Sequence, residues 1–540
     1  MSAEETVELA LLTKQLEELN RIGAALSAER DTRRLLELIL TKARAITGSD
    51  AGSLYVVEPL DDRGEDGIVD GREPPRRLRF MIAQNDSVSV PFKENVLEID
   101  DVSIAGHVAL TGEIVRLEDA YTLPADVRYS FSRSFDETTG YRTRSVLAAP
   151  LQTPKGHVVG VVQLINAKRD PDARLDSPAA FDAHVVPFTA RHDALVTSLA
   201  GQAAIALENS QLYTSIRQLF EGFVRASVVA IESRDPATSG HSFRVTNLTI
   251  ALAEAVDRAA GPFAGVQFSR DDMRTMRYAC LLHDFGKVGV RDEVLVKAKK
   301  LYPAQLALIR ERFKLARRSR ELDSLRERHE YLLAEGPSAY RERKPAFEAA
   351  LEAELAALDG YLAEIGTANE PTPVPEGHFE RLRDIAAVAF EDVDGRRPLL
   401  DEDEVRLLSL RKGSLSEEER VEIESHVVHT FNFLKQIPWT AEIRRIPSIA
   451  LGHHEMLNGT GYPRRLSGAG IPIQTRMLTI CDIFDALSAA DRPYKKAVPI
   501  ERAVQILGAA VSDGQLDADV FALFMEARVF DRWHVEPHAY

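Results

Sequence analysis

The spacing of hydrophobic residues changes near residue 181 of this 540-residue chain. Before that point, short runs rich in Val, Ile and Leu recur between turn-rich loops, at 53–58, 78–83, 113–117, 145–151 and 157–165. Beyond it, apolar residues recur at helical spacing and almost no strand signal remains. A chain of this length holds two or more domains. We expect an α/β domain with a mostly antiparallel sheet and an N-terminal helix within 11–45, followed by an all-α domain.

A regular apolar stripe predicts the connection between these domains. It consists of Leu212, Ile216, Leu219, Phe223 and Ala226, at steps of four, three, four and three residues. This spacing is typical of a coiled coil. We expect one long helix from about 193 to 233, whose stripe pairs with a second copy in a parallel homodimer; the alternative is a stripe that packs on its own domain. The predicted domains are 1–210, a linking helix at 211–233, and 234–540.

The helical domain contains an unusual stretch at about 302–400. Two long amphipathic segments are followed by a Pro-rich break at 367–377 and a third helical segment. No candidate ligand cluster falls here. We interpret the stretch as an inserted helical hairpin and leave open whether it is a lid, a dimer surface or a structural excursion.

Charge and cysteine content limit the possible partners. Lys and Arg total 67 against 83 Asp and Glu, a net charge of −16 that would repel polymeric nucleic acid while leaving room for a small anion in a local pocket. The N-terminus lacks the features of a signal peptide, and no apolar stretch approaches the roughly 20 residues of a membrane span. We expect a cytoplasmic protein. Cys280 and Cys481 lie among apolar residues and are predicted to be buried thiols.

Histidine and aspartate residues form the strongest candidate site. Several of them lie next to apolar runs or predicted helix ends: His241, His283, Asp284, His426, His453, His454 and Asp482. A buried carboxylate is costly unless it is paired or bound to metal. The alternative is a helical core with hydrogen-bonded histidines, but the number of candidates favours a metal site.

Imidazole and carboxylate ligands suit iron, manganese or zinc. We expect Asp284 to bridge two ions, with one remaining group on each ion. The first group is His241, His283 and Asp482, and the second is His426, His453 and His454, with His429 competing for the place of His426. Two metals about 3.5–4 Å apart polarise a phosphoryl oxygen and activate water. The expected chemistry is phosphodiester hydrolysis, with Lys287 balancing a phosphate oxygen.

Three blocks resemble the HD-GYP phosphodiesterases, bacterial enzymes that hydrolyse cyclic dinucleotides. The blocks are HDFGK at 283–287, HHEMLNGTGYP at 453–463 and DIFDALSAADRPYKKA at 482–497. The resemblance implies the ligand set above, holding two divalent ions that are iron or manganese. It also implies that Lys287, Tyr462, Arg492 and Lys495 face the substrate and that Asp485 stands behind the ligands.

The sequence departs from this family in two places. The spacing between His283 and the next ligand is longer than usual because of the 302–400 stretch. Members with three metals carry a Glu four residues before His241, where this chain has Ala237. Asp235 and Glu232 are displaced from that position, so we expect two metals rather than three.

The first domain resembles a GAF sensor domain over about 20–210. The matching blocks are SIAGHVALTG at 103–112, TGYRTRSVLAAPL at 139–151 and VVQLINAKRD at 161–170. Asn166, Lys168 and Phe188 are similar to the signature of cyclic-nucleotide-binding GAF domains, although the closing pair is His192-Asp193 rather than Asp-Glu. Asn166 and Lys168 are candidates for a ligand site, and a ligand-free dimerisation domain is the alternative.

These resemblances imply hydrolysis of cyclic di-GMP to linear pGpG, GMP or both, regulated by the GAF domain. Two other functions remain open: a receptor that binds cyclic dinucleotides without cutting them, and an HD-type nucleotide phosphohydrolase. The complete ligand set disfavours the receptor. The paired His453 and His454, together with the Gly-Tyr-Pro block, disfavour the general phosphohydrolase.

Overall fold

The computed structural model describes residues 17, 19–29, 31–59, 76–89, 96–234, 239–373, 377–392, 394–489 and 498–532. The chain forms two compact units, Met1–Phe220 and Glu221–Tyr540, and the division falls inside the predicted linking helix. An α/β unit therefore precedes a mainly helical one, as the sequence predicted.

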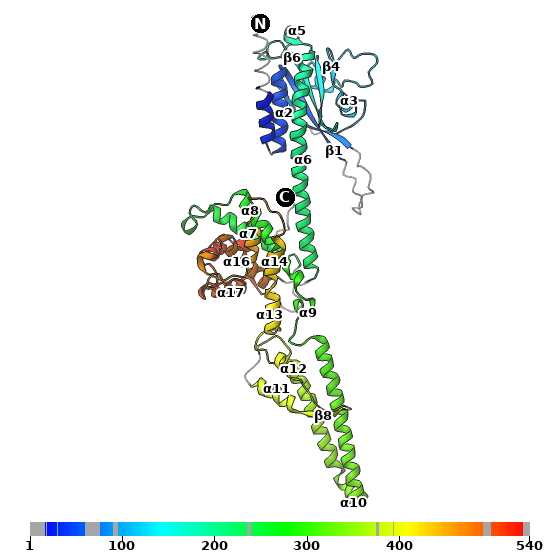
Figure 1. The fold of residues 1–540 in the computed structure, drawn as a ribbon, viewed down its shortest axis with the longest axis vertical. Helices are drawn as coiled ribbons and strands as arrows, with labels where there is room; N and C mark the ends of the chain where they lie inside the picture. The colour runs from blue at the N-terminus through cyan, green and yellow to red at the C-terminus, as the bar shows by residue number, and fades with distance from the viewer. Residues whose placement is uncertain are drawn as a thin grey trace. The chain divides into compact units, whose positions relative to one another are not determined.

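Unit 1 is built on an antiparallel sheet in the order β3-β2-β1-β6-β5-β4, with β7 paired to β6 (Figure 1). The strands are β1 Ser49–Pro59, β2 Arg76–Asn85, β3 Val96–Glu98, β4 Val115–Leu117, β5 Val146–Gln152, β6 Val158–Lys168 and β7 Val185–Val186. All five predicted strands are present. The sequence missed β3 and β7, which are only 3 and 2 residues long and too short for an alternating pattern.

Alternating side chains of this sheet enter two separate cores. In β5, Leu147 and Ala149 pack with helices α2 (Thr32–Thr47) and α6 (Ala190–Glu232), whereas Val146 and Ala148 pack with α3 (Ile104–Thr111). The unit also contains the short helices α4 (Ser134–Thr139) and α5 (Pro178–His184) and a helical segment at 19–28 that precedes α2. Successive side chains of a strand point to opposite faces, so the sheet is covered on both sides.

Helix α6 continues from unit 1 into unit 2 and matches the long helix predicted at 193–233. Its middle part leaves the apolar stripe uncovered: Leu212, Ile216, Leu219 and Phe223 are 53%, 62%, 76% and 49% exposed. The stripe therefore does not pack on the chain's own described residues, which disfavours the alternative considered for it.

Unit 2 contains a helical layer around the predicted ligands. Its helices are α7 His241–Arg258, α8 Arg270–Leu282, α9 Asp292–Leu295, α13 Glu417–Glu424, α14 His426–Leu434, α15 Ile446–Leu451, α16 Ile473–Ser488, α17 Ile500–Ser512 and α18 Ala518–Glu526. Helix α7 packs against α8 and α16, and α15 packs against α8 and α14. A short 3-10 helix, η3 (Phe285–Gly289), follows α8 and packs against α14. Cys280 and Cys481 are buried free thiols within this layer.

The stretch at 302–400 forms the predicted helical hairpin (Figure 1). The range α10, Pro303–Ala368, is two helices separated at Gly336, which has a φ of 80°. Phe313 of the first arm packs in one core with Leu358 and Ile365 of the second arm. The third helical segment, α11 (His378–Ala387), and α12 (Glu402–Leu408) join this core through Ile385 and Leu407.

Two short strands occur within this stretch of an otherwise helical unit. Strands β8 (Ala389–Asp392) and β9 (Gly395–Pro398) form a small antiparallel hairpin. Phe390, together with Leu399 and Leu400 that follow the hairpin, anchors it in the hydrophobic core. Four-residue strands that are mostly polar carry no clear period-two signal.

Within the described residues, none of the helices combines the length and the hydrophobicity that crossing a membrane requires.

Candidate metal centre

Helix ends bring most of the predicted ligands together in unit 2. They are His241 at the start of α7, His283 and Asp284 at the end of α8, His426 at the start of α14, His453 and His454 after α15, and Asp482 inside α16. Potential ligand atoms lie within 4.8 Å of one another in three groups: His241, His283 and Asp482; His426, His453 and His454; and His283, Asp284 and His453. The first two groups are those expected from the sequence.

Asp284 turns one carboxylate oxygen toward each of these two groups. Its Oδ1 lies 3.3 Å from Nε2 of His426 and 3.9 Å from Nε2 of His453. Its Oδ2 lies 3.6 Å from Nε2 of His283 and 3.8 Å from Nε2 of His241. A single carboxylate therefore reaches both groups, which is the geometry that a bridging ligand needs.

Backbone hydrogen bonds orient three of the imidazole rings. The Nδ1–H groups of His283, His426 and His453 each donate to the carbonyl oxygen three residues earlier, at 2.6 Å. This arrangement leaves Nε2 of the neutral ring with its lone pair directed into the site. Nε2 of His283 is buried and has no hydrogen-bond partner. The nitrogen and oxygen donors thus fit a pair of divalent transition-metal ions.

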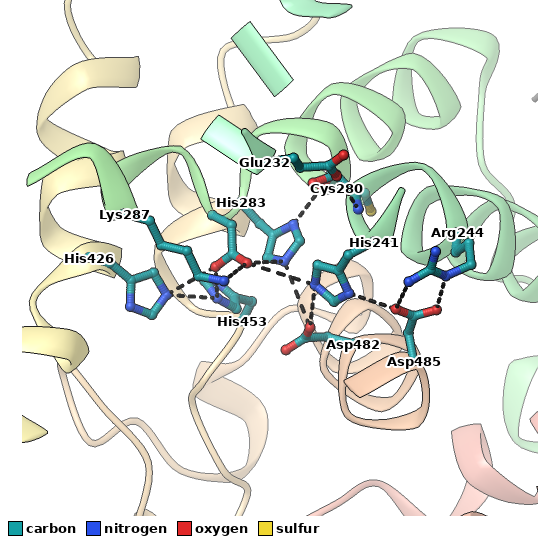
Figure 2. Close-up of polar contacts among 12 residues, drawn as sticks. Glu232, His241, Arg244, Cys280, His283, Lys287, His426, His453, Asp482 and Asp485 are labelled. Carbon is teal, nitrogen blue, oxygen red and sulfur yellow. Dashed lines mark hydrogen bonds and ion pairs between the residues drawn. The ribbon is translucent and has the colours of Figure 1, made fainter. Parts of the chain in front are cut away.

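Asp485 binds the ring nitrogen of His241 that faces away from the other ligands, a supporting position that the family resemblance implied. Its Oδ2 lies 2.7 Å from Nδ1 of His241, opposite the ring nitrogen that approaches Asp482 at 3.2 Å (Figure 2). Arg244, one turn further along α7, donates to Asp485 at 2.7 and 3.1 Å. The sequence analysis missed Arg244, although its position three residues after His241 places both on one helix face.

The segment after Asp284 lies directly against α14. The N–H of Gly286 donates to Oγ1 of Thr430 at 2.8 Å, and this hydroxyl donates to the carbonyl of His283 at 2.9 Å. A Cβ on Gly286 would lie 1.9 Å from the carbonyl oxygen of His426. Glycine is therefore needed for close approach between two ligand-bearing segments.

A second close approach shapes the Gly-Tyr-Pro block. A Cβ on Gly461 would lie 2.4 Å from the carbonyl oxygen of His454. Glu455 accepts hydrogen bonds from the N–H of Arg464 and from the N–H two residues later, at 2.7 and 2.8 Å. The ring of Tyr462 consequently lies against His454, with 4.8 Å between centroids.

Burial and neighbouring charges set the protonation of the cluster. Burial opposes ionisation of Asp284, but Lys287, whose Nζ is 2.8 Å from Oδ2, holds the pKa of this carboxyl well below its usual range. Burial disfavours the charged ring of His241, yet hydrogen bonds to Asp482 and Asp485 raise its pKa to about 9. A metal ion that binds His241 must therefore displace a proton.

The opposite shift occurs at the other group of histidines. Burial lowers the pKa of His453 well below its usual range, and the neighbouring His454 adds to this effect. Burial also lowers the pKa of His454 to about 4. Both rings are neutral at pH 7 and able to bind a metal ion without losing a proton.

Some predicted site residues lie apart from the cluster or outside the described residues. Four of them lie outside the described residues. They are Arg492 and Lys495, which were predicted to face the substrate, and Ala237 and Asp235, which were used to predict two metal ions rather than three. His429 is exposed, whereas His426 is buried in the cluster. The carboxylate of Glu232 is occupied by two backbone N–H groups.

The two candidate ligand residues of unit 1 make bonds within the fold. Asn166 is fully buried, and its side chain bonds to the backbone of Arg142 and Arg144 at 2.9 and 2.8 Å. Nζ of Lys168 donates to the carbonyl of Ala173 at 2.9 Å and lies 3.2 Å from Oδ1 of the buried Asp50. These contacts give both residues a structural role, and a cyclic nucleotide at this position stays a prediction.

Comparison with protein families assigns both units. A GAF-domain profile matches residues 31–207, and two HD-domain profiles match 238–352 and 403–520. The chain is a GAF–HD protein. The residues between the two HD matches fall within the inserted hairpin and the elements that pack on it.

Curated relatives of this GAF–HD protein include two phosphodiesterases. It is 34% identical over 194 residues to the 3'3'-cGAMP-specific phosphodiesterase 3 of Vibrio cholerae serotype O1, a match covering 33% of this chain and 41% of the relative. It is 31% identical over 147 residues to the cyclic di-GMP phosphodiesterase response regulator RpfG of Xanthomonas campestris pv. campestris, covering 24% and 37%. The chain thus spans less than half the length of either relative.

Solved structures similar to the GAF–HD protein match about a third of it. The GAF domain/HD domain protein from Geobacter sulfurreducens is 16% identical, with a TM-score of 0.23, and the match covers 35% of this chain and 98% of that one. The GAF domain of a phosphotransferase from Acinetobacter is 17% identical, with a TM-score of 0.26, over 37% and 98%.

Proposed function

We propose that this GAF–HD protein is a metal-dependent phosphodiesterase that hydrolyses a cyclic dinucleotide. The observation that carries the proposal is the position of Asp284, which turns one oxygen toward each of two ligand groups. Two relatives are named as phosphodiesterases of cyclic dinucleotides, which supports this substrate class. The complete set of ligands favours an enzyme over a receptor that binds without cutting.

In this proposal, the chain holds two divalent ions, iron or manganese. His241, His283 and Asp482 would hold one, His426, His453 and His454 would hold the other, and Asp284 would be shared by both. When bound, two such ions supply Lewis-acid activation of a phosphoryl oxygen and of water. The protein itself fixes the donors before binding, because the Nδ1 atoms are already hydrogen-bonded to carbonyl oxygens.

Lys287 and Tyr462 are the described residues that we assign to the substrate. Lys287 pairs with Asp284 in this structure, so its positive charge lies beside the bridging carboxylate, where a substrate phosphate would approach. The half-buried Tyr462 presents an aromatic face beside His454. We propose cyclic di-GMP as the substrate, cut to linear pGpG, GMP or both, with 3'3'-cGAMP as the competing dinucleotide.

We also propose that two copies pair through the apolar stripe of α6 and that the GAF domain regulates the HD domain. Four exposed apolar residues at steps of four, three and four follow one face of this helix. Exposed apolar stripes of this kind mark association surfaces.

The test is a hydrolysis assay on protein purified without oxygen and loaded with Fe(II) or Mn(II). Cyclic di-GMP and 3'3'-cGAMP are supplied separately, and the products are separated by chromatography. We expect metal-dependent turnover of at least one dinucleotide. If the metal-loaded protein binds a dinucleotide but releases no product, the proposed function becomes that of a receptor that binds without cutting.

A further inference from the structure

The last turns of helix α6 are packed firmly into unit 2. Val224, Val228 and Ile231 are only 1%, 2% and 6% exposed, in contrast to the exposed stripe on the same helix. Two charged residues at this end, Glu232 and Arg234, reach segments that carry predicted metal ligands.

Glu232 completes the beginning of α7, the helix whose first residue is His241. The N-cap of α7 is Gly240, which has no side chain to accept a hydrogen bond from the first turn. The two carboxylate oxygens of Glu232 accept the N–H of Gly240 at 2.8 Å and the N–H of Ser242 at 3.1 Å. The free N–H groups of a helix start need acceptors, and a negative charge is favourable there. Glu232 thus fixes the backbone on both sides of His241.

Arg234 makes a corresponding contact with the segment that follows Asp284. Its guanidinium donates to the carbonyl oxygens of Val288 and Val290, at 2.7 and 3.3 Å, and to Oδ1 of Asp292. These residues directly follow the segment that contains Asp284 and Lys287. Five N–H donors in a rigid plane suit such multiple contacts.

We propose that Glu232 and Arg234 are positioning residues that fasten the end of α6 to two ligand-bearing segments, so that the position of α6 sets the position of His241 and Asp284. Helix α6 begins in unit 1, and its last residue caps α7. A displacement or rotation of α6 therefore acts on the start of α7, and so on His241, through the carboxylate of Glu232. The inference rests on the metal centre proposed above.

The experiment uses the full chain with Glu232→Ala, Glu232→Gln and, as a matched control, Arg225→Ala at an exposed position of α6. Amide hydrogen exchange of the metal-free protein is measured by mass spectrometry, and Mn(II) affinity by titration. For Glu232→Ala we expect exchange in the first turn of α7 to rise about fivefold, as for loss of a helix cap. We expect the weaker of two Mn(II) affinities to fall about tenfold.

Glu232→Gln should give intermediate values, because its amide oxygen accepts one N–H without carrying charge, and Arg225→Ala should match the wild type. Arg234→Ala should raise exchange at 285–290 instead. The inference is overturned if amide exchange in α7 is the same in Glu232→Ala as in the wild type. It is also overturned if amide exchange rises uniformly in several helices, including α16. If the wild type binds no Mn(II), the proposed function is wrong, and amide exchange still decides this inference.

Discussion

At the scale of single residues, the site depends on Asp284 more than on any other side chain. It is 8% exposed and lies within 4 Å of four imidazole nitrogens and of Lys287. An ionised carboxylate at such a position requires positive partners, and Lys287 is the partner that the chain itself provides.

We predict that Asp284→Ala binds fewer than two metal ions and retains less than about 1% of the wild-type turnover, because it removes the carboxylate that, among the described residues, faces both groups. His429→Ala is the matched control, since His429 lies one turn from His426 but is exposed. Metal content is measured by elemental analysis after anaerobic purification. Equal metal content in Asp284→Ala and wild type would contradict the bridging role.

Two glycines should respond oppositely to the same substitution. Gly286→Ala should destabilise unit 2 by about 3 kcal/mol or more, because its Cβ would lie 1.9 Å from the carbonyl of His426. Gly222→Ala should stabilise the protein by about 0.5–1 kcal/mol, because Gly222 lies within α6 with no atom within 4 Å of an added Cβ. Calorimetry of both variants checks the signs. A wild-type melting temperature for Gly286→Ala would show that the two segments can separate without cost.

At the scale of elements, an ion pair joins α13 to the beginning of the hairpin. Both carboxylate oxygens of Glu419, in α13, accept a hydrogen bond from Nζ of Lys297, each at 2.7 Å. The carboxylate also accepts a hydrogen bond from the hydroxyl of Tyr302. The side chain of Lys297 is only 1% exposed. The hairpin core, formed by α10, α11, α12 and β8, is a hydrophobic cluster of its own. This contact therefore helps to fix the hairpin onto the helices near the site.

We predict that Glu419→Gln destabilises this contact by about 3 kcal/mol at pH 7, because it leaves the charge of a buried lysine without a counter-charge. Burial opposes ionisation of Glu419, but Lys297 and Tyr302 hold its pKa below the ordinary value of 4.5. The stabilisation is therefore present above pH 4.5 and is lost as the pH falls through the lowered pKa. Unfolding at several pH values should show the two proteins converging in acid.

The exposed Glu418 provides a control for this prediction, because its contact with Arg406 is open to solvent. Glu418→Gln should unfold as the wild type does at pH 7. A constant difference between Glu419→Gln and wild type from pH 7 down to pH 3 would refute the ionic explanation.

At the scale of the whole molecule, α6 joins two units that have separate cores. Its exposed stripe is the surface through which we propose that two copies pair. The predicted metal ligands all lie in unit 2, so the metal centre and the proposed dimer surface can be tested separately.

We predict that Leu219→Glu converts a dimer into a monomer, because it places a charge in the middle of the stripe at a residue that is 76% exposed in the single chain. Thr214→Glu, on the opposite side of α6, should remain dimeric. Light scattering after size-exclusion chromatography measures the mass. A dimeric Leu219→Glu, or a monomeric wild type, would exclude pairing through this stripe.

Deletion of residues 1–215 should leave a folded helical protein that still binds metal, since every predicted ligand lies beyond residue 240. Circular dichroism and metal analysis of the truncated protein check this expectation. Complete loss of metal would show that unit 1 is needed to form the centre.

The sequence alone predicted the class of each unit, five strands, the long helix, the hairpin and the two groups of candidate ligands, because these depend on local hydrophobic period and on residue types at helix ends. Only the tertiary structure brought His241, Asp284, His426 and Asp482 together. It also revealed the roles of Arg244 and Thr430, ordinary polar residues whose partners lie far away in the chain. Such partners depend on how helices pack, and one-dimensional spacing does not determine which helix ends meet.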